Sequence, residues 1–244
     1  MKLSRGQIAI LFLIVANIIW GAASPIFKWT LQDIEPFTFG FLRFFLSALI
    51  LLPFTFKHLS IKKADIPILL FIAIIGQGLR LGYHFFALQL SPSINAPIID
   101  ASAPIFIIIG GIFLFREKTK TKVFVGGIMS LIGVLMITLQ PLYETGPSQS
   151  LLGNVFLIIS TGLLVIYMLF LKQLTPSYRP VTLLFWIFAI SAITFFPLAS
   201  VETFFAASEF HITERVIIGI LFASFLCTCF AYWLETYAMK YINV

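Results

Sequence analysis

The stretch from Asn95 to Lys122 constrains the fold of this chain more than any other, because a long apolar run in it ends abruptly in a basic cluster. The run carries a single acid, Asp100, and the cluster that follows is Arg-Glu-Lys-Thr-Lys-Thr-Lys. About 20 predominantly apolar residues are what an α-helix needs to cross the hydrocarbon core of a bilayer. We therefore predict that this stretch crosses a membrane and that its basic cluster marks the cytoplasmic end.

The composition of the whole chain requires the same environment. Of its 244 residues, 60% are hydrophobic and only 11% are charged, whereas soluble domains carry about 25% charged residues. The net charge of +6 comes from basic residues in short loops, which form no continuous stripe. We therefore exclude nucleic acid as a partner and predict an all-α, polytopic transmembrane helix bundle in a lipid bilayer.

Eight apolar segments are long enough to span the membrane. They cover residues 8–27, 37–56, 66–88, 94–115, 123–142, 151–171, 181–201 and 216–238. The first follows two basic residues, as a secretory signal would, but it is long for a signal core and seven more spans follow. We interpret it as a retained helix.

The loops predict the orientation of the chain. With a cytoplasmic N-terminus, twelve of the 16 Lys and Arg residues fall on the cytoplasmic side, and only Lys28 and Arg215 fall outside. Arg43 and Arg80 lie within spans. This bias follows the positive-inside rule. We predict a multi-pass protein of the cytoplasmic membrane with both termini in the cytoplasm.

A weak internal repeat indicates how the spans are organised. A shift of about 144 positions places Pro36-Phe37-Thr38 on Pro180-Val181-Thr182. Spans one to three then resemble spans six to eight. Each span is five spans away from its counterpart, and because five is an odd number the second copy is inverted in the membrane. We predict a first five-helix repeat at 1–142, an extracytoplasmic linker at 143–150 and a partial second repeat at 151–244. The expected architecture is an incomplete ten-helix transporter.

The ionisable residues inside the spans are the main candidates for a substrate site. Arg43, Arg80 and Asp100 lie at a similar depth, about 9–12 Å from the outer span ends at 1.5 Å per residue. Charges at a helix centre cost about 2.5–3.5 kcal/mol on insertion scales and usually face the protein interior. We expect Asp100 to meet one or both arginines. The alternatives are a structural ion pair and arginine side chains that extend to the interface.

Two further ionisable residues lie among aromatic side chains near span ends. We interpret His84 as part of an interfacial aromatic belt, with a proton relay as the alternative. Glu235 is interpreted as interfacial too, and its alternative role is an acid at the cytoplasmic mouth that binds a cationic group or a proton.

In the first span Asn17 and Ser24 are seven residues apart and so lie nearly on one helical face, with Trp20 beside them, which suits either a cavity wall or helix–helix packing. Cys227 and Cys229 are interpreted as small hydrophobic residues within a span. No phosphate-binding loop or hydrolase motif occurs in the sequence. We therefore predict no cofactor, no metal site and no catalytic residues.

Several motifs resemble the EamA-like branch of the drug/metabolite transporter superfamily. They are NIIWGAASP from Asn17, PFTFGFLRFFLSALILLP around Arg43, the stretch ALQLSPSINAPIIDASAPIFIIIGGIFLFREK with Pro104 and Glu117, and GGIMSLIGVLMI. The resemblance implies two inverted five-helix repeats whose first four helices line a central cavity. The chain departs from that pattern in lacking a ninth and a tenth helix, and in placing Asp100 where the family is more often apolar.

The resemblance and the residues together predict a secondary transporter that exports a small metabolite or drug-like compound by alternating access. The predicted substrate-binding residues are Asn17, Trp20, Arg43, Arg80, His84, Asp100 and Glu235. The expected partners are a small-molecule substrate and the lipid bilayer, with a homodimer as a further option. Two other functions stay open: an intramembrane enzyme that uses Asp100, His84 or Glu235, and a structural membrane subunit.

Overall fold

The computed structural model describes residues 4–103, 105–107, 121–144, 149–205 and 212–241, and all regular structure in these ranges is helical. Six helical stretches are long and apolar enough to cross a membrane: Arg5–Thr30, Pro36–His58, Lys63–Leu90, Gln149–Leu174, Pro180–Phe204 and Glu214–Ala238. A shorter apolar helix covers Val125–Gln140. The predicted all-α, polytopic bundle is confirmed.

The elements follow the predicted spans closely. Spans one and two are α1 (Arg5–Thr30) and α2 (Pro36–Thr55), and span five is α7 (Thr121–Glu144). Spans six and seven are α8 (Gln149–Leu174) and α9 (Pro180–Phe205). Both α2 and α9 begin at a proline, which fits the first helical position because its missing amide hydrogen has no intrahelical partner there.

Spans three and eight share an unusual feature, a π-helical centre. Span three consists of α3 (Ile66–Phe71), the π-helix η3 (Ile72–Leu79) and α4 (Arg80–Leu90). Span eight consists of α10 (Glu214–Leu221), the π-helix η4 (Phe222–Ala231) and α11 (Tyr232–Ala238). Two short 3-10 turns, η1 (Phe56–His58) and η2 (Lys63–Asp65), connect α2 to span three. Segments of π-helix occur frequently at functional sites.

The fourth predicted span is interrupted. Its first helix, α5 (Asn95–Asp100), ends in a turn at Ala101 and Ser102 before helical structure resumes. Pro104 lacks the amide hydrogen that a continuous helix would bond to the carbonyl of Asp100. Pro104 itself, the matched Glu117 and most of the basic cluster lie outside the described residues, so their predicted roles stay predictions.

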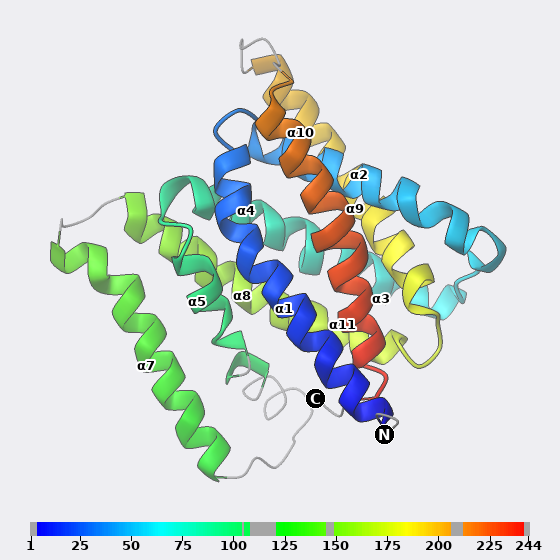
Figure 1. Cartoon of the computed structure of the whole chain (residues 1–244), viewed down its shortest axis with the longest axis horizontal. Coiled ribbons are helices and arrows are strands. Elements are labelled where there is room, and N and C mark those ends of the chain that lie inside the picture. The colour runs from blue at the N-terminus through cyan, green and yellow to red at the C-terminus, as the bar shows by residue number, and fades with distance from the viewer. Residues whose placement is uncertain (1–3, 104, 108–120, 145–148, 206–211, 242–244) are drawn as a thin grey trace.

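The helices pack in a reciprocal pattern about one pair, called the central pair for the extent of its contacts, which lies toward the right of Figure 1. The pair is α2 and α9, the most extensively packed helices of the described structure. On one side α1 lies along α10, η4 and α11, and on the other α8 lies along η3 and α4. Likewise α2 contacts η4, and α9 contacts η3. An inverted repeat would produce this exchange of contacts, although the predicted repeat boundaries stay a prediction.

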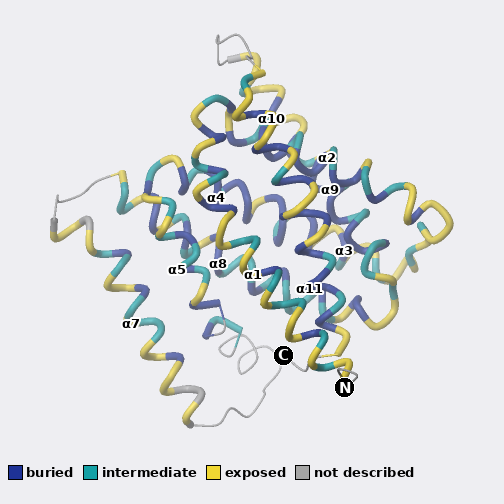
Figure 2. Tube along the Cα trace, viewed as in Figure 1, coloured by how far each residue is buried: buried dark blue, intermediate teal, exposed yellow. Residues whose placement is uncertain are grey.

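A glycine lets the central pair approach closely. A Cβ atom at Gly40 would lie only 2.6 Å from Cε1 of Phe195, so α2 and α9 meet at a position without a side chain. Phe44 stacks on Phe188, with ring centroids 5.8 Å apart. Buried residues concentrate where these helices cross, while the outer faces are exposed (Figure 2). The outer face of α1 presents Ile10, Leu11, Ile14 and Ile18, as expected of a surface solvated by lipid.

Candidate functional site

Span eight presents a buried row of polar residues to the interior of the bundle. Ser224, Thr228, Tyr232 and Glu235 are each at most 3% exposed. Within the π-helical segment η4, the Thr228 hydroxyl donates a hydrogen bond to the carbonyl of Ala223, five residues back, at 2.7 Å. Polar side chains at this depth in an apolar bundle are costly and usually serve a function.

Arg43 of α2 reaches this row at Thr228. Its Nε donates a hydrogen bond to the Thr228 hydroxyl at 2.6 Å, and its side chain is only 2% exposed. The guanidinium carbon lies 4.9 Å from the ring centroid of Phe27 and 5.6 Å from that of Phe44. Cation–π contacts of this kind hold a guanidinium plane in place. Nη1 of Arg43 has no hydrogen-bond partner in the described structure.

Arg80, the first residue of α4, reaches the same row one helical turn further along, at Tyr232. Its Nη2 donates to the Tyr232 hydroxyl at 2.6 Å. The side-chain oxygen of Gln77 accepts hydrogen bonds from Tyr232 at 3.3 Å and from Arg80 at 3.5 Å. The Tyr232 ring packs edge-on against Trp20, with centroids 5.2 Å apart. We call Arg43, Gln77, Arg80, Thr228 and Tyr232 the central cluster.

The expected ion pair between Asp100 and the arginines is not formed. Oδ1 of Asp100 instead accepts a hydrogen bond from the Thr161 hydroxyl of α8 at 2.6 Å. Within the described ranges, no ion pair joins Asp100 to Arg43 or Arg80. The short helix α5 ends at Asp100 and packs against α8, so the Asp100 carboxylate meets Thr161 of that helix.

Three interfacial interpretations are wrong. His84 is 6% exposed and Glu235 is 2% exposed, so both lie inside the bundle rather than in an interfacial belt. The arginines do not extend to the interface either, since Arg80 is only 6% exposed. Spans three and eight each turn one face toward the interior of the bundle, so the polar side chains on that face meet other helices. Nδ1 of His84 and Oε2 of Glu235 lack hydrogen-bond partners among the described residues.

The two candidates on α1 separate. Trp20 joins the interior, because its indole N–H donates to the carbonyl of Cys227 at 3.3 Å. Asn17 is exposed, and its side-chain amide donates to the carbonyl of Leu13 in its own helix at 2.8 Å. The structure therefore brings Trp20, Arg43 and Arg80 together and leaves Asn17 on the outer face. Glu235 lies next to Tyr232 on the same helix.

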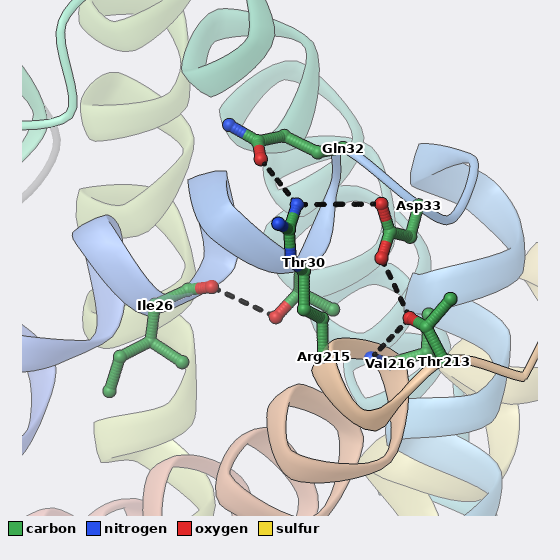
Figure 3. Close-up of polar contacts among 7 residues, drawn as sticks. All are labelled: Ile26, Thr30, Gln32, Asp33, Thr213, Arg215 and Val216. Atoms are coloured by element: carbon green, nitrogen blue, oxygen red, sulfur yellow. Dashed lines mark hydrogen bonds and ion pairs between the residues drawn. The ribbon is translucent and has the colours of Figure 1, made fainter.

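A second polar region, which the sequence analysis missed, lies where α1 ends and α10 begins (Figure 3). A cavity of about 500 Å³ is lined by Trp29, Asp33, Thr213, Glu214 and Arg215. Nη1 of Arg215 lies 3.6 Å from Oδ1 of Asp33, whose Oδ2 accepts a hydrogen bond from the Thr213 hydroxyl at 2.7 Å. The available signal was an acid and a base in two loops predicted on the same side of the membrane.

The opposite end of the bundle has a comparable polar contact between a loop and the start of span three. The Tyr178 hydroxyl donates to Oδ2 of Asp65 at 2.5 Å and accepts from the backbone amide of Lys62 at 3.1 Å. Partial burial, and secondly the hydrogen bond to Asp65, raise the pKa of Tyr178 above its ordinary value of 10.0. Nζ of Lys240 donates to the Tyr178 carbonyl at 2.7 Å. This contact connects the α8–α9 loop to the ends of spans three and eight.

Cys227 and Cys229 are buried free thiols, and the part of the chain that the structure describes has no group of three or more His, Cys, Asp or Glu residues arranged to hold a metal ion.

The model of the EamA-like transporter family matches residues 7–139, which is more than half of the chain. The chain belongs to the EamA-like transporter family.

Relatives of this EamA-like chain are named as transporters. An uncharacterized transporter of Archaeoglobus fulgidus is 25% identical over 232 residues, covering 94% of this chain and 79% of the relative. The uncharacterized inner membrane transporter YhbE of Escherichia coli strain K12 is 25% identical and covers 90% and 71%. The S-adenosylmethionine uptake transporter of Rickettsia felis is 27% identical over 197 residues, covering 79% and 64%.

A solved crystal structure shows the same fold. It matches with a TM-score of 0.66 and 15% identity, covering 95% of this chain and 78% of the solved chain. In this EamA-like transporter, the central cluster places two arginines against hydroxyl and amide groups inside an apolar bundle. Such a site can bind a polar solute by hydrogen bonds and charge, away from bulk water.

Proposed function

We propose that this EamA-like protein is a secondary transporter that moves a small polar metabolite by alternating access, with the central cluster as its substrate site. The observation that carries the proposal is the burial of Arg43 and Arg80 inside the bundle, where their hydrogen-bond partners among the described residues are neutral. Ionisable groups at such a depth usually mark a substrate or ion pathway. Trp20 forms part of the wall of this site.

Polar contacts at the two ends of the bundle support alternating access. One end carries the contact of Asp33 with Thr213 and Arg215, and the other carries the contact of Tyr178 with Asp65. Each contact joins a loop to the beginning of one of the two spans with a π-helical centre. We propose that one contact opens while the other stays closed, so that the central cluster faces one side of the membrane at a time.

The sequence supports a proposal for the driving force of transport and for the location of the protein. The sequence carries no nucleotide-binding loop, so an ion gradient or exchange supplies the driving force. The basic loops support a cytoplasmic-membrane protein with both termini in the cytoplasm.

We propose outward transport of an unmodified metabolite and no catalysis. A homodimer is part of the proposal, tested by the mass of the purified protein. Because the Rickettsia felis relative is named for uptake, both directions of transport need measuring.

The experiment uses the purified chain in proteoliposomes loaded with a labelled extract of small metabolites. Mass spectrometry of both compartments should show at least one compound that crosses the membrane chemically unchanged. Arg80→Gln should reduce this flux about tenfold or more, because hydrogen bonds to charged groups contribute about 1.5–3 kcal/mol. Arg5→Gln, at an exposed arginine at the start of α1, is the matched control and should keep the flux near that of the parent protein.

Two outcomes would contradict the proposal. Conversion of a metabolite without translocation would indicate an intramembrane enzyme. Neither flux nor conversion, together with stable association with another membrane protein, would indicate a structural subunit.

A further inference from the structure

Three buried N–H donors of the central cluster point to the chemistry of its ligand. Nη1 of Arg43, Nε of Arg80 and Nε2 of Gln77 have no hydrogen-bond acceptor in the described structure. The three side chains are 2%, 6% and 0% exposed, so bulk solvent does not satisfy these donors. Buried polar groups are hydrogen-bonded in most native proteins, and an exception calls for a missing partner.

The unpaired groups are mainly donors on cations. Among the described residues, neither Arg43 nor Arg80 forms an ion pair, and their partners are the hydroxyl groups of Thr228 and Tyr232 and the amide of Gln77. A buried cation without a counter-ion is strongly unfavourable. Two acids lie on neighbouring segments: Asp100 is bonded to Thr161, and Glu235 interacts with Arg80 electrostatically but lies beyond ion-pair distance from it.

The two guanidinium groups are directed by the same helix face. Thr228 and Tyr232 are four residues apart, so each holds one N–H of one arginine from successive turns of span eight. The rings of Phe27 and Phe44 flank the guanidinium group of Arg43. A planar guanidinium fork with free N–H groups matches the geometry of a carboxylate or a phosphate.

We infer that the central cluster binds an oxyanion group, a carboxylate or a phosphate, through Arg43, Arg80 and Gln77. This inference rests on the proposed function insofar as the oxyanion belongs to the transported substrate. It narrows the substrate class to small organic anions, or zwitterions that carry an anionic group. Glu235 lies one turn beyond Tyr232 and is not a donor to the anion.

The test measures the thermal unfolding of the full chain, purified in detergent, against four soluble probes at matched ionic strength. Sodium acetate and inorganic phosphate are the oxyanions, tetramethylammonium chloride is the cation and glycerol is the neutral solute. At least one oxyanion should raise the unfolding midpoint in a concentration-dependent manner, and the cation and the neutral solute should not. Equal effects of all the salts would overturn the inference.

Variants identify the donors. Arg43→Gln and Arg80→Gln should each weaken oxyanion binding about tenfold or more, and Arg43→Lys should weaken it less than Arg43→Gln because it keeps the charge. Arg5→Gln, at an exposed arginine outside the cluster, should bind the oxyanion as the parent does. Glu235→Gln should bind the oxyanion at least as tightly, because a negative charge near the cluster is removed. A loss of oxyanion affinity with Glu235→Gln equal to that with Arg80→Gln would show that the site depends on this carboxylate as much as on the arginine, and would overturn the inference.

A final arm distinguishes the source of the anion. A short-chain phosphatidylglycerol that stabilises the protein when acetate and phosphate do not would assign the oxyanion to a lipid headgroup, and would overturn its assignment to the substrate. Failure of the inference differs from failure of the proposed function. Flux of a neutral or cationic metabolite that is insensitive to Arg43→Gln would overturn the inference alone. Oxyanion binding without flux in either direction would overturn the transporter proposal alone.

Discussion

The guanidinium group of Arg80 donates a hydrogen bond to the hydroxyl of Tyr232 at 2.6 Å, although 152 positions separate the two residues in the sequence. This bond connects spans three and eight, the two spans with π-helical centres. It lies in the interior of the bundle, so its loss affects both stability and the geometry of the central cluster.

Tyr232→Phe should therefore lower the free energy of unfolding by about 1–3 kcal/mol, because it leaves a buried charged donor without its acceptor. Tyr167→Phe is the matched control, since the Tyr167 hydroxyl is buried on a neighbouring helix without a hydrogen-bond partner in the described structure. Removal of the Tyr167 hydroxyl should change the free energy of unfolding by less than about 0.5 kcal/mol. Denaturant unfolding in detergent measures both, and equal losses would contradict the assigned bond.

A second prediction concerns the contact between span three and α8. A Cβ atom at Gly76 would lie 2.8 Å from Cβ and 3.1 Å from Cα of Tyr167, so Gly76→Ala should cost about 1–3 kcal/mol through overpacking. Gly162→Ala, in the same α8, meets nothing within 4 Å. It should be neutral or stabilise the helix by up to about 1 kcal/mol. Thermal unfolding of the two variants should shift in opposite directions or at least differ clearly, and identical shifts would count against this packing.

The loop contact at Tyr178 predicts a dependence on alkaline pH. Partial burial and the hydrogen bond to Asp65 raise the pKa of Tyr178 above 10.0 in the folded protein. The protonated phenol therefore stabilises the fold fully below the unfolded pKa, and this contribution is lost as pH rises through the folded pKa. Tyr178→Phe should remove this part of the alkaline decline in the unfolding midpoint. Tyr143→Phe, at an exposed tyrosine, should retain the full alkaline decline in the unfolding midpoint. The same decline in both variants would refute the assignment of this decline to Tyr178.

At the other end, the pair of Asp33 and Arg215 should contribute little to stability. The side chains are 24% and 44% exposed, and such pairs contribute about 0–1 kcal/mol. Asp33→Asn should thus cost less than about 1 kcal/mol, and the cost should shrink as salt is raised from low concentration to about 1 M. Glu35→Gln, at a neighbouring exposed acid, serves as the control for general charge effects. A large loss that salt does not change would contradict a solvated pair.

The long elements of this fold could be predicted from the sequence, because crossing a bilayer imposes a minimum apolar length on each helix. Spans one to three and six to eight lie close to their predicted ranges. The burial of Arg43 and Arg80 inside the bundle was also expected, since lipid is a poor solvent for an isolated charge. Trp20 packs edge-on against Tyr232, which fits either of the two roles predicted for it, a cavity wall or helix–helix packing.

The partners of these residues could not be predicted. Both lipid-facing and protein-facing sides of a membrane helix are apolar, so the sequence does not show which face of span eight meets Arg43 or Arg80. Depth alone suggested that Asp100 would pair with an arginine, whereas the turn after Asp100 and the hydroxyl of Thr161 decide otherwise. The π-helical segments could not be predicted, because no pattern of apolar residues distinguishes them from α-helix in a membrane span. The cavity at Trp29 and Arg215 could not be predicted either, because residues from two loops far apart in the sequence form it.

The close crossing of α2 and α9 at Gly40 and Phe195 has a consequence for how such a bundle can move. The backbone of α2 lies directly against the Phe195 ring of α9, and ring contacts join the two helices on either side of this point, from Phe37 to Phe195 and from Phe44 to Phe188. Sliding one helix along the other would drive the Phe195 ring into the main chain of α2. We therefore expect α2 and α9 to move as one rigid body in any rearrangement of the bundle, with the other helices shifting around them.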